Sequence, residues 1–467
     1  MVIFTSKTSM SLLVKRSLFA IIAVFFFFPY LSTLRDPFFW DTIQFAGKHG
    51  LFFFENGLSF LPDMVDSGHI PFLGYYLSIL WHLFGKTLLV SHLAMVPFLL
   101  LYLLFTFKIS NILDSQNSLF IWMLFLFEPC LLTQSTLVSP DLLLMAGFAI
   151  MLYGTLGNHE LSILNGSVLM VLAGNRGTAV VFAIGVVWLW QHKQTLLQKL
   201  LWLFPAFLIF CSYQLLHYHS KGWIGYHDGM PWAVSFERVG LIGILKNIGL
   251  MAWRLLDTGR ISLCLIALFL FFNIKQNKTT LARDVLRILF AVSIILAVTT
   301  LPYRYLTGHR YYMPVYFLLI AFVSSSLPNH WALIKKRILY TFILSSFILG
   351  HFIIYPKGIA MGWDSTLAYL PYQKLRKEVI GDLDGLGLFP KDVGSYFPNV
   401  SGFEATDLST AHGVGFAKDN PLSKKYVLIS NVMNDVPDHL IDDINNSWIV
   451  EKEWHSGSIY FMLMSKK

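Results

Sequence analysis

The chain has 467 residues, of which 55% are hydrophobic, 16% are aromatic and only 13% are charged. Soluble globular proteins carry a charge on about a quarter of their residues, so this composition excludes an ordinary soluble protein and indicates an integral membrane protein. The net charge of +8 does not indicate nucleic-acid binding, because Lys and Arg fall in short groups between apolar runs. Three cysteines lie inside apolar runs and are expected to be small buried side chains, neither disulfides nor metal ligands: Cys130, Cys211 and Cys264.

The first apolar run, SLFAIIAVFFFFPYLSTL, begins directly after Lys15 and Arg16. It is longer than the apolar core of a typical secretory signal peptide, and no small-x-small cleavage site follows it before RDPFFWD. We therefore expect a retained membrane helix at this position.

About eleven windows are long and apolar enough to be membrane spans, since a hydrocarbon core of about 30 Å requires roughly 20 residues of helix. The expected spans are 17–34, 87–107, 117–134, 139–156, 161–174, 177–191, 198–217, 261–274, 286–302, 312–327 and 338–355. The fifth and sixth windows are short, and only Asn175 and Arg176 separate them.

Lys and Arg collect in four short segments, and such segments lie on the cytoplasmic side of membrane proteins. With eleven spans all four fall on the same side, so the N-terminus is expected in the cytoplasm and the C-terminus outside. The four groups are Lys7, Lys15 and Arg16; Lys193 and Lys199; Lys275, Lys278, Arg283 and Arg287; and Lys335, Lys336 and Arg337.

The predicted fold is an α-helical polytopic membrane protein, with a membrane domain at 1–356 and a small extracytoplasmic α/β domain at 357–467. Two outer loops, at 35–86 and 218–260, are long enough to carry function. Within them IPFLGYYLSILWHLFG and RVGLIGILKNIGLMAWRLL are expected to form helices that lie in the membrane interface.

The tail becomes polar from Pro356 and contains short β-rich runs. KKYVLISNV, SWIVEKEW and SIYFMLMSK are predicted strands, the last two joined by a turn at 455–458, and DHLIDDIN is a predicted helix.

Asp41 follows three aromatic residues, Phe38, Phe39 and Trp40, shortly after the first span. Acids at the end of a span often only hydrate a loop, but these aromatic side chains would hold the segment against the bilayer, where desolvation raises the basicity of a carboxylate. Asp41 is therefore the candidate general base. Asp36 is less favoured because a proline follows it and it can serve to shape the turn.

The same loop contains DMVDSGHIP, with Asp63, Asp66 and His69. An acid and a histidine three residues apart can ligate a metal, but a solvated loop is the simpler interpretation and no metal site is predicted. Together with Tyr75 in the helix that follows, these residues are candidates for binding substrate hydroxyls. Holding the interfacial helix by its N-terminus is an alternative role.

Glu128 and Asp141 lie in EPCLLTQSTLVSPDLLL, where we expect them to face each other across a turn that contains Pro129 and Pro140. An ionisable group at a membrane boundary favours a functional role, yet a helix N-terminus also favours an acid such as Asp141 without one. Asp141 is the second candidate for catalysis.

A late outward loop, LPYRYLTGHRYYMPVYF, carries Arg304, His309, Arg310 and Tyr311. These cations run against the inward preference for positive charge, and arginine matches phosphate oxygens in a bidentate geometry. A phosphate at headgroup level is the expected partner, and ordinary contact with lipid headgroups is the alternative. Arg176, in AGNRGTA, is another outward cation that can join the same site.

A carboxylate near the bilayer, cations at headgroup depth and aromatic surfaces suit a reaction whose donor is a lipid phosphate. The base would deprotonate an acceptor hydroxyl, the hydroxyl would attack the anomeric carbon of a sugar, and the arginines would stabilise the departing phosphate.

In the order of these features the chain resembles the GT-C membrane glycosyltransferases, in particular the ArnT-like and protein O-mannosyltransferase-like branch known as glycosyltransferase family 39. The similarity runs from about residue 10 to 356 and rests on WDTIQFA, SGHIPFLGYYLSILWHLFG, SPDLLLMAGFAIML and GHRYYMPVYFLLIAF. The soluble tail carries no part of it.

The resemblance implies a polyprenyl-phosphate-linked sugar donor, transfer on the outer side of the membrane and inversion at the sugar. It also implies that Asp41 is the catalytic acid of the first loop. The family commonly has Asp-Glu there, whereas this chain has Asp41-Thr42, so the role of the second acid is vacant or belongs to Asp63, Asp66 or Asp141.

Two other classes of membrane protein are alternatives to a glycosyltransferase. A transporter or flippase of lipid-linked sugars would place charges near the bilayer midplane, whereas here ionisable residues gather at the outer boundary. A polysaccharide polymerase or ligase would centre on a large loop late in the chain. The sequence does not specify the sugar, the acceptor (lipid, protein or glycan) or the need for a divalent cation. The expected location is a bacterial inner membrane.

Overall fold

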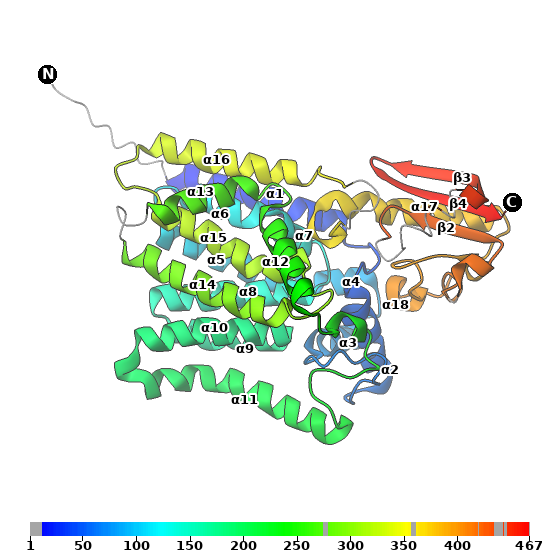
Figure 1. Cartoon of the computed structure of the whole chain (residues 1–467), viewed down its shortest axis with the longest axis horizontal. Coiled ribbons are helices and arrows are strands. Elements are labelled where there is room, and N and C mark those ends of the chain that lie inside the picture. The colour runs from blue at the N-terminus through cyan, green and yellow to red at the C-terminus, as the bar shows by residue number, and fades with distance from the viewer. Residues whose placement is uncertain are drawn as a thin grey trace.

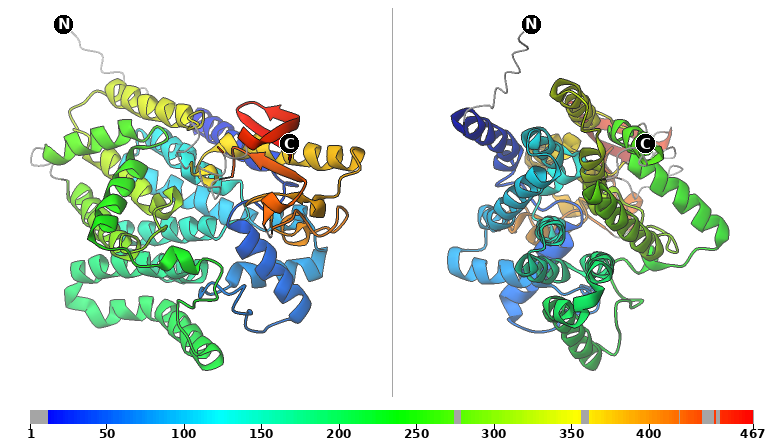
Figure 2. Two further views of the ribbon diagram at one scale, coloured as in Figure 1. Left: turned by 45° about the vertical axis from the view of Figure 1, so that its right-hand side comes forward. Right: turned by 90° about the vertical axis from the view of Figure 1, so that its left-hand side faces the viewer.

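A computed structural model describes residues 12–273, 279–355, 361–418, 420–433, 442 and 446–466. Helices that run side by side form a large body, and a small domain with a four-stranded sheet lies at one end of it (Figure 1). Figure 2 looks nearly along the helices in its right-hand view and shows how they surround one another.

The body consists of helices that arise from the apolar windows of the sequence. They are α1 (Leu12–Ser32), α4 (Leu88–Leu93), α5 (Val96–Leu113), α6 (Ser118–Phe127), α7 (Pro129–Ser135), α8 (Pro140–Gly157), α9 (Glu160–Ala173), α10 (Asn175–Gln191), α11 (Leu196–Lys221), α12 (Leu241–Leu256), α13 (Ile261–Phe272), α14 (Thr280–Thr300), α15 (Met313–Ser326) and α16 (Leu333–Gly350). Each of the eleven windows predicted as a span overlaps at least one of them.

Helices α8 and α15 form the centre of the body: most residues of α8 and nearly every residue of α15 are buried. A helix that is apolar on all sides is stable when other elements or lipid surround it, and here other elements do. Helix α8 approaches α9 closely at Gly147 and Gly166: a Cβ added to Gly166 would lie 2.4 Å from the backbone nitrogen of Met151. Small residues at such crossings let two helix backbones pack together.

Two helix pairs bend sharply at polar residues. Helices α6 and α7 meet at 68° around Glu128, and α12 and α13 meet at 101° across 257–260. Pro129 begins α7, because proline is well accommodated at the first helical position. Gly259 has φ +82°, a conformation that side chains disfavour.

By length and composition, three helical segments of the described chain can cross a membrane, or up to five when each bent pair counts as one span. The three are Leu88–Leu113, Pro140–Gly157 and Lys193–Lys221. The helices predicted as spans are therefore present, while the number of eleven spans stays a prediction.

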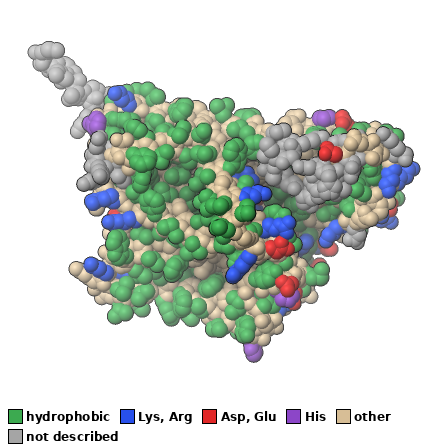
Figure 3. Space-filling model, viewed as in Figure 1, with side chains coloured by type: hydrophobic (Ala, Val, Ile, Leu, Met, Phe, Trp, Pro, Cys, Tyr) green, Lys and Arg blue, Asp and Glu red, His purple; other side chains and the backbone are tan. Residues whose placement is uncertain are grey.

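Apolar side chains are spread over the face of the body that Figure 3 shows. Helix α11 alone exposes Leu197, Leu201 and Phe207 by 80%, 69% and 62%. Lys and Arg side chains lie at the end of the body away from the small domain, and others lie near the small domain. The predicted orientation therefore stays a prediction.

The first loop folds into a π-helix, η1 (Ile43–Lys48), followed by α2 (His49–Asn56) and α3 (Phe72–Phe84). Helix α3 occupies the first segment predicted to be an interfacial helix, and α12 occupies the second. Both are therefore helical as expected, and their depth in a membrane stays a prediction.

The small domain contains η6 (Trp363–Ser365), η7 (Leu367–Tyr369), α17 (Leu370–Gly385), η8 (Pro390–Asp392), β1 (Val393–Gly394), α18 (Phe403–Asp407), η9 (Pro421–Ser423), β2 (Tyr426–Ser430), β3 (Trp448–Ser456) and β4 (Ile459–Lys466). The strand order is β1-β2-β4-β3; β1 and β2 are parallel and the other pairs are antiparallel. The three predicted strands and the hairpin turn are confirmed. The helix predicted at 438–445 lies outside the described residues, apart from Asp442.

The small domain packs directly on the segment that leads to Asp41. The backbone N–H of Phe38 donates to the carbonyl of Thr406 over 2.8 Å. The ring of Phe39 stacks on that of Tyr369 with centroids 4.8 Å apart. The predicted boundary near residue 356 therefore separates two segments of sequence that share one interface.

Candidate active site

Asp41 lies at the start of η1, where local contacts fix the backbone. Trp40 directly before it has φ +58°, a conformation that is uncommon for a bulky side chain, and its ring packs on Phe397. Thr42 Oγ1 accepts a hydrogen bond from the N–H of Phe39 over 2.8 Å. The unusual backbone at Trp40 turns Asp41 toward the body at the point where the sequence predicted a catalytic acid.

Arg310 is the centre of the site, and three carboxylates surround its guanidinium. It forms a close ion pair with Asp41, its Nη1 lies 2.8 Å from Asp364 Oδ2, and its Nε lies 3.7 Å from Asp141 Oδ2. Arg310 belongs to the short helix η5 (His309–Tyr312) directly before α15. These acids come from the first loop, the start of α8 and the small domain, so segments far apart in the sequence meet here.

Asp141 is held at the N-terminus of α8. Ser139 caps this helix by accepting a hydrogen bond from the N–H of Asp141 over 3.1 Å, which fixes the backbone that carries the carboxylate. That carboxylate forms a close ion pair with Arg176, at the start of α10. Arg176 also donates to the carbonyl of Arg310 over 3.0 Å, so the two arginines are adjacent.

Asp364 is buried in η6 and was not among the predicted site residues. Gln134 in α7 donates to its backbone carbonyl over 2.7 Å, and Ser365 donates to its Oδ1 over 3.3 Å. Burial raises the pKa of the Asp364 carboxyl above its usual range, and repulsion from Asp41 adds to this, while Arg310 opposes it.

Tyr311 provides an aromatic surface for both cations. The guanidinium carbon of Arg176 lies 4.6 Å from the centre of its ring, and that of Arg310 lies 5.3 Å away. The side chains of Arg176 and Asp41 remain 24% and 19% exposed, so a ligand can reach them. Arg176, Arg310, Asp41, Asp141 and Tyr311 were all predicted, and the structure brings them together.

His309 lies beside this cluster in a second polar group. Its Nε2 is 2.6 Å from Asp257 Oδ2, and Tyr355 donates closely to Asp257 Oδ1. Burial lowers the pKa of His309 to about 4, so the ring is neutral at pH 7 and donates to Asp257. Arg254 lies 3.7 Å from the same carboxylate. His309 therefore joins the bend between α12 and α13 to η5 and does not contact the three acids of Arg310.

The residues of DMVDSGHIP divide between the interior and the surface. Asp66 is buried and its Oδ2 lies 3.0 Å from His217 Nε2, while Asp63 pairs with Lys221 and is half-exposed. Asp66 Oδ1 also accepts the N–H of Gly68 over 2.8 Å, which shapes the loop itself.

His69 is the member of this loop nearest to the arginines. Its ring lies 3.6 Å from the position that a Cβ on Gly174 would take, next to the start of α10. Burial lowers its pKa to about 4, and the positive charge of Arg176 lowers it further, while hydrogen bonding to Asn175 opposes both. His69 is thus a neutral ring at the edge of the Arg176 site.

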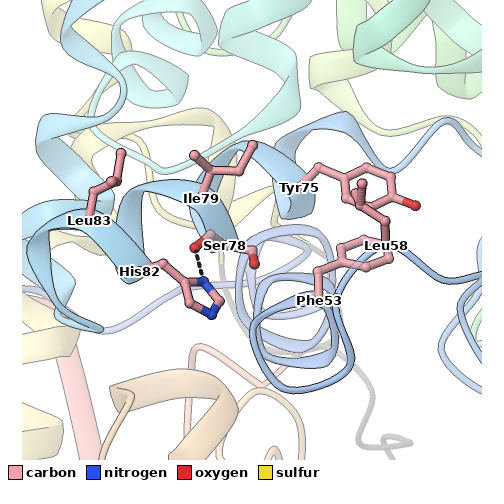
Figure 4. Close-up of a pocket in the computed structure, with 8 residues that line it drawn as sticks. Phe53, Leu58, Tyr75, Ser78, Ile79, His82 and Leu83 are labelled. Atoms are coloured by element: carbon pink, nitrogen blue, oxygen red, sulfur yellow. Dashed lines mark hydrogen bonds between the residues drawn. The ribbon is translucent and has the colours of Figure 1, made fainter.

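Arg304 and Tyr75 lie outside the cluster. Arg304 Nη1 pairs with Glu237 over 2.7 Å on the surface, where both side chains are about half exposed. Tyr75 stacks on Phe53, with ring centroids 3.8 Å apart, and lines an apolar groove of about 280 Å³ between α2 and α3 (Figure 4). Leu58, Ile79 and Leu83 complete its apolar wall, and none of its lining residues belongs to the cluster around Arg310.

Glu128 and Asp141, expected to face each other across a turn, have separate partners. Glu128 pairs with Arg260 in the interior and caps α7 through the N–H of Leu131. Sequence reasoning missed the partner residues Asp364, Arg254, Asp257 and Arg260. One signal was present for Asp364: GWDST repeats the Trp-Asp dipeptide of FWDTI at Asp41.

The described part of the chain contains no group of three or more His, Cys, Asp or Glu side chains arranged to hold a metal ion. Asp63, Asp66 and His69, which the sequence left open as ligands, are engaged in separate contacts.

The helical body, the folded first loop and the sheet-bearing tail form a fold that is also found among solved structures. Two solved structures share it: ArnT from Cupriavidus metallidurans bound to undecaprenyl phosphate, at 12% identity and a TM-score of 0.56, and the same protein in the apo state, at 13% and 0.54. Each comparison covers 97% of this chain and 98% of the other. No protein-family profile and no curated protein sequence matches the chain. The predicted resemblance is thus confirmed at the level of the fold.

Proposed function

We propose that this protein is an integral-membrane glycosyltransferase that uses a polyprenyl-phosphate-linked sugar as donor. The observation that carries this proposal is the convergence of Asp41, Arg176 and Arg310 on one partly exposed site. A carboxylate beside two adjacent guanidiniums supplies a base and an anion-binding group for the same reaction. The fold supports the donor class, because one ArnT structure with this fold is bound to undecaprenyl phosphate.

In the proposed reaction Asp41 takes the proton of an acceptor hydroxyl. The hydroxyl oxygen forms a bond to the anomeric carbon of the sugar as the bond between that carbon and the phosphate oxygen breaks. The phosphate leaves with the bonding electron pair, and Arg310 and Arg176 stabilise its negative charge. Attack from the side opposite the phosphate inverts the anomeric configuration.

The proposed site faces the extracytoplasmic side of a bacterial inner membrane. The four groups of Lys and Arg support an N-terminus in the cytoplasm, with the small domain and the site outside. The donor reaches the site from the outer leaflet, with its phosphate at the depth of the arginines. The acceptor is a hydroxyl-bearing lipid, protein or glycan.

The test uses purified protein in nanodiscs and a panel of polyprenyl-phosphate sugars, with sugar release or transfer as the readout. Wild type is expected to consume at least one donor. Asp41→Asn is expected to retain donor binding and to turn over at least about a hundredfold more slowly. Arg304→Gln is the control, because Arg304 lies on the same loop but outside the cluster.

Binding of undecaprenyl phosphate is measured in parallel. If wild type binds neither this lipid nor any of the sugar donors, the glycosyltransferase proposal is wrong. If wild type binds a donor and moves it across a vesicle membrane without cleaving it, the protein is a flippase.

A further inference from the structure

The charges around Arg310 set a condition on phosphate binding. Two guanidiniums, Arg176 and Arg310, contact three carboxylates, Asp41, Asp141 and Asp364. With all five groups ionised the cluster carries 2 − 3 = −1, so adding a phosphate to it as it stands is electrostatically unfavourable. One carboxylate must leave Arg310, or lose its charge, before a donor phosphate can take its place.

The three carboxylates differ in how firmly they are held. Asp141 is 4% exposed and has Arg176 as a second partner, and Asp364 is 8% exposed and has Ser365 as a second partner. Asp41 is the most exposed of the three at 19%. Within the described residues its carboxylate accepts a hydrogen bond from Arg310 alone.

The surroundings of Asp41 allow its side chain to turn away. Its backbone is fixed through its carbonyl, which accepts the N–H groups of Gln44 and Phe45 over 3.0 and 3.1 Å. Among the described residues, rotation about the side-chain bonds therefore breaks no hydrogen bond or ion pair except the one with Arg310. Asp364 has no such freedom, because Gln134 holds its backbone and the packing of η6 buries its side chain.

We propose that Asp364 is the fixed partner of Arg310 and that Asp41 is the exchangeable one, so that a lipid phosphate arriving at Arg310 displaces Asp41 and frees it to act as a base. This inference rests on the proposed function. Asp364 does not touch the reacting atoms and acts through Arg310, so it is a positioning residue. Before the donor binds, the ion pair holds the Asp41 carboxylate on Arg310.

The charge on Asp364 holds the Arg310 guanidinium in place when the Asp41 carboxylate moves away from it. The charged or titratable groups that face Asp364 come from four elements: Arg310 in η5, Asp41 before η1, Asp141 in α8 and Cys130 in α7. Without the charge on Asp364, Arg310 has Asp41 as its close anionic partner and moves with it when the Asp41 side chain rotates. The base then stays ion-paired even in the donor complex.

The first experiment compares wild type, Asp364→Asn and Asp364→Glu in nanodiscs, using the donor that wild type consumes and measuring kcat and KM. For Asp364→Asn we expect a kcat at least about tenfold lower and a KM that rises less than about threefold, because Arg310 still binds the phosphate while Asp41 stays ion-paired to it. Asp364→Glu is expected to restore kcat. Asp384→Asn, in the half-exposed surface pair with His412, is the matched control and is expected to behave as wild type.

A merely structural role for Asp364 would raise KM together with the fall in kcat, and Asp364→Glu would restore neither; this result would overturn the proposal. The second experiment needs no variant: the structure of wild type in nanodiscs with undecaprenyl phosphate. We expect the phosphate on Arg310, Asp364 still within hydrogen-bond distance of Arg310, and Asp41 separated from it.

A bound structure in which Arg310 keeps Asp41 and loses Asp364 would contradict the proposal. If wild type turns over a donor and Asp364→Asn equals wild type, only the role of Asp364 fails. If wild type neither binds the lipid phosphate nor turns over any donor, the proposed function fails and this inference fails with it.

Discussion

The buried ion pair between Glu128 and Arg260 allows the fold to be tested quantitatively. Both side chains are fully buried, and Arg260 Nε lies 2.5 Å from Glu128 Oε1. The pair joins the bend between α6 and α7 to the bend between α12 and α13, across 132 residues of sequence. Arg260 also donates to Thr258 Oγ1, and its guanidinium lies 3.9 Å from the centre of the Tyr316 ring.

Removing either partner leaves an uncompensated charge in the interior. Glu128→Leu is expected to cost about 3–5 kcal/mol of unfolding free energy, because arginine cannot give up its proton. Arg260→Met leaves a carboxylate that can become neutral, and protonating an ordinary glutamic acid side chain at pH 7 limits that electrostatic cost to about 3.7 kcal/mol. The double variant replaces both charges by apolar side chains and is expected to lie within about 2 kcal/mol of wild type.

The assay is a double-mutant cycle of unfolding free energies at pH 7 in detergent micelles. The expected coupling between the two positions is at least about 3 kcal/mol. The half-exposed pair Arg287–Asp284 on α14 serves as the control, with an expected coupling of no more than about 0.5 kcal/mol. Additive effects of Glu128→Leu and Arg260→Met would refute the argument that these two bends depend on one ion pair.

Three further predictions follow from particular contacts. Gly47→Ala is expected to lower stability by about 1–3 kcal/mol and to impair turnover, because the new Cβ would lie 2.0 Å from the carbonyl oxygen of Ala405 in the small domain. Gly381→Ala, which meets open space in α17, is the control, and equal melting temperatures for the two variants would contradict this packing. His309 has its pKa lowered by burial from 6.5 to about 4, so its contribution is complete above pH 6.5 and is lost by up to about 3.4 kcal/mol as the pH falls toward 4. The melting temperature of wild type should therefore fall more steeply over that window than that of His309→Gln, and parallel curves would argue against a neutral buried ring. Arg304→Gln is expected to change the affinity for undecaprenyl phosphate by less than about twofold in a nanodisc binding assay, whereas a tenfold loss would place Arg304 at the donor.

The helices were predictable because their signal is local. An apolar run of sufficient length forms a helix wherever it is buried or meets lipid, and all eleven windows overlap one. The β3–β4 hairpin was predictable for the same reason, from strand-forming runs on both sides of a turn with Gly457 at φ +60°. The number of spans does not follow from such local patterns, because a helix of intermediate length can also lie buried in the body.

The members of the site were predicted more completely than their partners. Arg176 and Arg310 were predicted because they lie in outward segments, whereas Lys and Arg usually collect in cytoplasmic ones. Arg304 carried the same signal, yet it lies six residues before Arg310 and outside η5, where it pairs on the surface. Whether an arginine reaches the site depends on where the chain turns into α15, which the residue type does not reveal.

Asp364 was missed because it belongs to a segment that looks like a linker. It follows the last helix of the body and lies among small and polar residues, so neither apolar periodicity nor charge pattern marks it. Its partner Arg310 lies 54 residues earlier, and only the folded chain brings the two together. The Trp-Asp dipeptide that it shares with Asp41 was the available sign.

The tail is therefore part of the site as well as a domain beside it. Asp364 supplies one of the three carboxylates around Arg310, and Tyr369 stacks on Phe39 two residues before Asp41. Both contacts come from the first turns after the body, before the sheet begins. Recognition of an acceptor by the small domain would not by itself require a buried carboxylate in contact with Arg310. These contacts support a domain that also sets the position of the base and the charge of the cation on which the donor phosphate is proposed to bind.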